Sequence, residues 1–119
     1  MSLIIDYTSN FFKASPIAEK VGTITSNALD LGSGNVFSHA PSSNTTYTFS
    51  NPPASGTAYG FTLKVTPSAT VTLTWPSSVD WGNGTAPEAP ESGATNIYTF
   101  YTTDGGTTYY GFLAGSAMA

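Results

Sequence analysis

Apolar and polar residues alternate along most of the chain after residue 20, and a period of two is typical of half-buried β-strands. In the segment 59–65, four apolar side chains share one parity, while glycine, threonine and lysine occupy the other. The segment 70–75 repeats this pattern. Because only a short connection with Pro67 and Ser68 lies between them, the two segments are predicted to form an antiparallel hairpin with one apolar face and one threonine face.

A second hairpin is predicted near the end of the sequence. Strands at 96–103 and 107–113 flank Asp104-Gly105-Gly106, whose residues tolerate the positive φ angles of tight turns. Shorter apolar or alternating segments predict further strands at 21–31, 35–39 and 45–50. The proline-rich residues 76–93 are interpreted as a long loop, and 114–119 as a tail of small residues.

These elements amount to about seven or eight short strands without a long helix. The fold class predicted is therefore all-β, an antiparallel, jelly-roll-like β-sandwich spanning residues 21–119. Residues 1–20 differ, because they hold two of the three lysines and isolated apolar clusters. We interpret them as an extended N-terminal arm that needs a neighbour to become ordered; an edge strand of the same domain is the alternative.

Charge narrows the classes of partner. Charged residues make up 8% of the chain, there is no arginine, and the formal net charge is -4. Nucleic acid and anionic membranes are poor partners for so few basic side chains. Cysteine is absent, so disulfides and thiolate metal sites are not expected. The N-terminus lacks the basic and apolar regions of a signal peptide, which predicts synthesis in the cytoplasm.

Candidate chemistry is sparse. The single histidine, His39, has no acidic neighbour in sequence and is interpreted as a structural residue. Glu88 and Glu91 lie in the proline-rich loop, where solvated charge is favoured over a glycosidase pair. Asp80 beside Trp81 is a pairing found in sugar sites, although Trp81 as a core residue is the favoured interpretation. We therefore expect no catalytic residue, no metal and no cofactor.

Four sequence segments resemble a β-module of tailed-phage virion proteins, including those of marine and cyanobacterial phages. They are Thr48–Leu63, Thr74–Trp81, Gly84–Pro87 and Asp104–Gly115. The similarity covers roughly residues 45–119 in order and spacing, and no residue of 1–40 takes part in it. In fibre-like and head-surface proteins such a module often forms the C-terminal part.

The resemblance implies a non-enzymatic virion protein and leaves two roles open. The favoured role is a capsid decoration (cement) protein on the capsid surface, a homotrimer whose arm contacts the major capsid protein. The capsid-contact candidates are Leu3, Ile4, Ile5, Tyr7, Phe11 and Phe12. The alternative is a tail-fibre tip or receptor-binding module, with glycan-contact candidates Asp80, Trp81, Tyr109 and Tyr110. A host-encoded carbohydrate-binding module is a third, different class.

Overall fold

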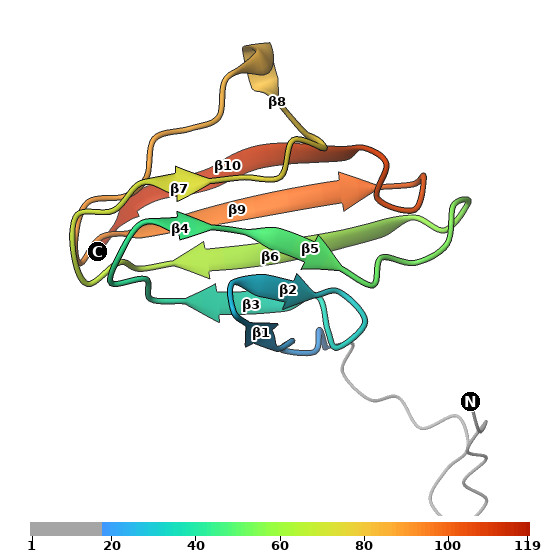
Figure 1. Cartoon of the computed structure of the whole chain (residues 1–119), viewed down its shortest axis with the longest axis horizontal. Helices are drawn as coiled ribbons and strands as arrows, with labels where there is room; N and C mark the ends of the chain where they lie inside the picture. Colours follow the sequence, from blue (N-terminus) through green and yellow to red (C-terminus); the bar gives the residue numbers. More distant parts are fainter. Residues whose placement is uncertain (1–17) are drawn as a thin grey trace, which may run out of the picture.

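The computed structural model describes residues 18–119, and this part of the chain is all-β, as predicted (Figure 1). It contains ten strands and one short 3₁₀ helix, η1 (Gly82–Gly84). The strands are β1 (Ile24–Thr25), β2 (Ala28–Asp30), β3 (Val36–His39), β4 (Thr45–Thr46), β5 (Thr48–Ser50), β6 (Tyr59–Val65), β7 (Leu73–Thr74), β8 (Val79–Trp81), β9 (Thr95–Thr102) and β10 (Tyr109–Met118).

The largest sheet has five strands in the order β3-β6-β9-β10-β8. Its centre is antiparallel, because β9 pairs with both β6 and β10 in opposite directions. The two edge strands pair in parallel, β3 with β6 and β8 with β10. The β9–β10 hairpin closes through Asp104, Gly105 and Gly106, and both glycines have positive φ. That hairpin confirms the prediction made from the Asp-Gly-Gly signal.

Two smaller sheets form the second layer of a sandwich-like fold. One has the order β1-β2-β5 and the other consists of β4 and β7 (Figure 1). They cover what we call the inner face of the five-stranded sheet, as the ring contacts of Phe49 on β5 demonstrate. Its ring centroid lies 5.0 Å from that of Phe61, 5.2 Å from that of Phe100 and 4.9 Å from that of Tyr109.

The core between the layers is mainly aromatic. Phe61 on β6 and Phe100 on β9 stack at 4.9 Å, and Tyr47 and Trp75 of the second layer stack at 5.1 Å. Trp75 also contacts Tyr98, with ring centroids 4.8 Å apart. In a domain without cysteine, this burial of large rings is the main source of stability.

The predicted hairpin between 59–65 and 70–75 is wrong, although the buried faces of both segments were predicted correctly. Strand β6 lies between β3 and β9, and β7 pairs in parallel with β4 in the other layer. Pro67 is buried, and the chain there is held by the hydrogen bond from the Ser68 N–H to the Pro41 carbonyl. The connection therefore leads from one layer to the other instead of turning back beside β6.

Other expectations also need correction. The segment 45–50 forms two strands, β4 and β5, which belong to different sheets on either side of the buried Tyr47. The loop 76–93 contains β8 and η1. The tail 114–119 continues strand β10 to Met118, with irregular pairing between Leu113 and Met118. Four of the strand pairings are parallel, so the sandwich is mixed.

The six capsid-contact candidates lie outside the described residues, as does most of the predicted arm. Its last residues, Glu19 and Lys20, contact the domain. The Asn35 side-chain amide donates to the Glu19 carboxylate at 2.7 Å, and the backbone N–H of Asn35 donates to the Lys20 carbonyl at 2.9 Å. The chain thus joins the sandwich beside edge strand β3, where Val21 bridges to Val36.

Candidate functional site

The outer face of the five-stranded sheet, which points away from the small sheets, carries large exposed apolar side chains. Tyr101 on β9 lies directly opposite Tyr110 on β10, so the two share one face. Tyr101 is 46% exposed, Tyr110 48% and Phe112 56%. Single exposed apolar residues are ordinary, but a contiguous group marks a surface that binds something.

Ile97 and Met118 extend this group along the two strands. Ile97 pairs with Gly115, and a side chain at Gly115 would meet the Met118 sulfur at 2.7 Å. Met118 therefore lies over Gly115 on the same face as Ile97. We call the five residues Ile97, Tyr101, Tyr110, Phe112 and Met118 the outer strip.

Two charged residues flank the outer strip. The sheet register defines one row across four strands, Gly60–Tyr101–Tyr110–Asp80, so Asp80 on β8 ends the row beside Tyr110. Lys64 lies on β6 opposite Ile97, four residues along the strand from Gly60. Both side chains are exposed.

The structure splits the four glycan-contact candidates between the two faces of the sheet. Asp80 and Tyr110 are register partners on the outer face. Tyr109 is only 3% exposed and packs in the core against Phe49. Trp81 is half-buried, and its ring centroid lies 5.3 Å from that of Trp75 and 5.6 Å from that of Phe100. The preferred interpretation of Trp81 as a core residue agrees with this packing.

A glycine makes room for Trp81 at the edge of the sheet. Gly111 is the register partner of Trp81, and a Cβ there would lie 2.8 Å from Val79 Cγ1 and 2.9 Å from the Trp81 ring. We expect Gly111→Ala to lower the free energy of unfolding by about 1–3 kcal/mol, because the extra methyl overpacks this site. Urea denaturation followed by tryptophan fluorescence measures the change.

Gly82→Ala is the matched control for that substitution. Gly82 directly follows β8, and a Cβ there has no atom within 4 Å. Its unfolding free energy should stay within about 0.5 kcal/mol of the parent value. Equal stabilities of the two variants would contradict the close packing of Trp81 on Gly111.

His39 pairs with a buried tyrosine. Its Nδ1 lies 2.8 Å from the hydroxyl oxygen of Tyr47, which is 0% exposed. Burial lowers the pKa of His39, so the ring is neutral at pH 7, and burial raises the pKa of Tyr47, with a smaller contribution from nearby Tyr98. The hydrogen bond links β3 to the residue between β4 and β5, and this supports the interpretation of His39 as structural.

Asp30 and Asp104 serve the turns. The Asp30 carboxylate accepts from the Gly32 N–H and from the Asn51 side chain, both at 2.9 Å. The Asp104 carboxylate accepts from the Thr108 N–H and from the Thr102 hydroxyl, both at 3.0 Å. The bond from the Thr108 N–H is the main reason that the pKa of Asp104 is lowered.

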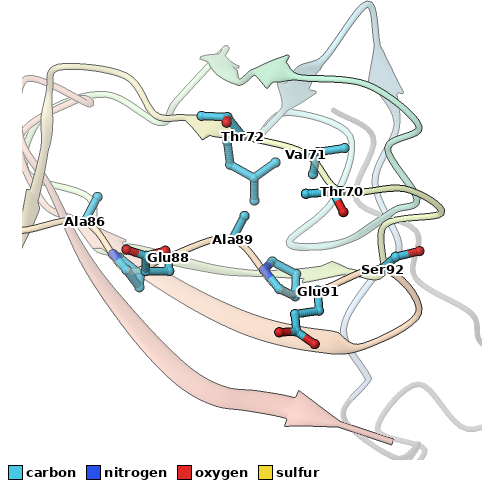
Figure 2. Close-up of a pocket in the computed structure, with 11 residues that line it drawn as sticks. Thr70, Val71, Thr72, Ala86, Glu88, Ala89, Glu91 and Ser92 are labelled. Atoms are coloured by element: carbon cyan, nitrogen blue, oxygen red, sulfur yellow. The ribbon is translucent and has the colours of Figure 1, made fainter.

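Glu88 and Glu91 line a groove of about 700 Å³ between the segment Thr70–Leu73 and the loop Ala86–Ser92 (Figure 2). Ala89 points into this groove, while the Glu91 carboxylate points away from the opposite wall (Figure 2). Both glutamates are exposed. Their exposure is consistent with the prediction of solvated charge.

Among residues 18–119, no group of three or more histidine or acidic side chains is placed to hold a metal ion. No helix in the same range is long and apolar enough to cross a membrane.

The outer strip was only partly predictable from the sequence. Tyr110 was singled out, whereas Tyr101, Phe112, Ile97 and Met118 were not. The sequence pattern that could have identified two of them is the alternation along β9, where Ile97 and Tyr101 occupy the positions between the buried Tyr98, Phe100 and Thr102. Comparison with protein-family models, curated proteins and solved structures gave no match.

Proposed function

We propose that this chain is a non-enzymatic structural protein of a phage virion, a decoration protein that binds the head surface and self-associates as a symmetric oligomer. The resemblance of residues 45–119 to the phage β-module suggests the virion. The outer strip is the observation that carries the proposal, because a broad apolar sheet face suits protein–protein contact.

Features of the domain outside the outer strip also suit a structural role. The polar contacts of His39, Asp30 and Asp104 hold strands and turns together. A core of packed rings and the absence of cysteine make the domain independent of redox conditions. A protein that persists on a particle benefits from both properties.

We assign the head contact to residues 1–17, which contain all six capsid-contact candidates. The hydrogen bonds of Glu19 and Lys20 with Asn35 attach the chain immediately after this segment. A division after Ile17 would therefore separate a head-binding segment from a sandwich that keeps its own contacts.

Deletion of residues 1–17 should abolish binding to heads that lack the protein, while the sandwich stays folded. The folded state is expected because the deletion leaves the hydrogen bonds at Asn35 and the aromatic cluster of residues 18–119 in the remaining chain. Co-sedimentation with purified heads measures binding, and far-UV circular dichroism with thermal unfolding checks the fold. Full binding by the truncated chain would contradict the assignment.

The virion copy number separates this role from the alternative of a fibre tip or receptor-binding module. Quantitative mass spectrometry of purified particles should find a copy number comparable with that of the major capsid protein. A few copies per particle would instead indicate a tail location. In that case Asp80 and Tyr110, which are register partners on the outer face, are the two candidates that could contact a glycan there.

A further inference from the structure

The charges on the outer face have an unusual distribution. Among residues 21–119 there are five acidic side chains and one basic one, Lys64. Four of the acidic residues lie elsewhere: Asp30 on β2, Glu88 and Glu91 in the groove loop, and Asp104 in the β9–β10 turn. Lys64 and Asp80 are the charged residues on the strands of the five-stranded sheet, both lie on its outer face, and their charges cancel although the chain carries -4.

These two charges lie at diagonally opposite corners of the outer strip. From β6 to β8 there are three strand spacings, or about 14 Å, and the four residues from Gly60 to Lys64 span about 13 Å along the strand. The diagonal of roughly 19 Å passes over Thr99, Tyr110 and Phe112, which lie between the corners. A second copy of this surface, rotated by 180°, would place its negative end over the positive end of the first copy and its positive end over the negative end.

We propose that the outer faces of two copies of this chain pack together about a two-fold axis. The axis lies in the plane of the interface. It passes through the midpoint of the diagonal from Lys64 to Asp80 and is perpendicular to that diagonal. Rotation about this axis places Lys64 of each copy over Asp80 of the other. The outer strips then form the centre of the interface. This is an isologous contact, in which one surface patch serves both copies.

The same axis gives a known packing of sheets. The diagonal makes an angle of roughly 45° with the strands, because its two components are nearly equal. Rotation about the perpendicular axis therefore turns the strands of the second copy by about 90°, and orthogonal packing is one of the two preferred arrangements of face-to-face sheets. The charge pattern thus selects an arrangement that is also sterically favoured.

Electrostatics favours a second copy over other occupants of this face. Two chains that each carry -4 repel one another over most of their surfaces. The outer face is where they can meet without that repulsion, and two ion pairs at its rim fix the orientation. This inference does not rest on the proposed virion location, and it specifies a two-fold contact where the phage resemblance implies a trimer.

Charge reversal tests the contact in the full chain. Sedimentation equilibrium between about 1 and 200 µM should reveal a monomer–dimer equilibrium. Lys64→Glu and Asp80→Lys should each weaken dimerisation about tenfold or more, because symmetry places two like-charge pairs in the interface. The double variant K64E/D80K should return to within about threefold of the parent.

The opposite net charges of the single variants provide the control. Lys64→Glu makes the chain more negative and Asp80→Lys makes it less negative, so a general charge effect would shift their dimerisation constants in opposite directions. Glu88→Lys changes the net charge away from the outer face and should not weaken the dimer. Thermal unfolding verifies that each exposed-site variant is folded.

Other results of these experiments would contradict a two-fold contact through the outer face. A chain that is monomeric at every concentration, or trimeric, overturns the proposal. So does a double variant that associates no better than the single variants. Glycan-array binding that is lost in Tyr110→Ala, by a chain that stays monomeric, would assign the outer face to a carbohydrate instead.

Discussion

Replacement of Phe61 by alanine should lower the free energy of unfolding by about 3–5 kcal/mol, the range for a large aromatic residue lost from a core. Phe61 is 2% exposed and lies at the centre of the aromatic cluster. Its ring contacts Phe100 at 4.9 Å, Phe49 at 5.0 Å and Tyr59 at 5.7 Å between centroids. The substitution removes contacts with both layers and leaves a cavity between rigid rings that cannot collapse to fill it.

Urea denaturation at pH 7 measures this loss, and Val21→Ala is the control. Val21 is 70% exposed, so its truncation should change the unfolding free energy by no more than about 0.5 kcal/mol. Small domains have a total stability of about 5–15 kcal/mol, so Phe61→Ala loses a large share of it and should be almost fully unfolded at the melting temperature of the parent. A loss under about 1 kcal/mol would refute the central position of Phe61.

The sequence was most informative about which side chains are buried. Along β6, the residues Phe61, Leu63 and Val65 are buried, and Lys64 is exposed, as the alternation predicts. The β9–β10 hairpin was also predictable, because Asp104-Gly105-Gly106 tolerates the positive φ angles that a tight turn requires. Both inferences depend on local stereochemistry, so the residues of one short segment are enough to make them.

Strand neighbours were less predictable, because alternation does not specify the partner. The apolar faces of β6 and β7 meet the same core from opposite layers, and a hairpin would bury the same side chains. The parallel pairings of β3 with β6 and of β4 with β7 join segments far apart in sequence. Strand β8 has three residues in a proline-rich segment, too few for a period to be recognised.

The outer strip required the register as well as the pattern. Nothing in the sequence connects Tyr101 with Tyr110, and only the pairing of β9 with β10 makes them neighbours. Likewise, Lys64 and Asp80 form a diagonal only because β8 lies at the far edge of the sheet from β6. A surface of this kind is a property of the assembled sheet.

Raising the pH above 10 should unfold the domain cooperatively. Burial is the main cause that raises the pKa of Tyr47, Tyr98 and Tyr109, and it raises that of Tyr59 to about 12, with help from Tyr109 and Asp30. Between pH 10 and the folded pKa, the unfolded chain has lost these protons and the folded chain retains them. Unfolding then releases protons, so stability falls as pH rises, by at most about 1.4 kcal/mol per pH unit for each tyrosine.

Tyr59 shows why ionisation is incompatible with the fold. Its hydroxyl donates to the carbonyl oxygens of Leu31 and Gly34, and a phenolate there would face both acceptors without a proton. Ionisation of Tyr47, Tyr59, Tyr98 and Tyr109, which absorbance at 295 nm reports, should therefore coincide with the loss of far-UV circular dichroism. Both signals should reverse together on return to pH 7.

Tyr98→Phe provides the comparison, because it removes one buried ionisable group. Tyr98 is 0% exposed and accepts a hydrogen bond from Asn96, so the variant should be less stable at pH 7. Above pH 10 its unfolding free energy should nevertheless decrease less steeply than that of the parent, since one fewer proton is released. Full tyrosine ionisation with an unchanged dichroism spectrum would show that the rings titrate inside an intact fold, contrary to this prediction.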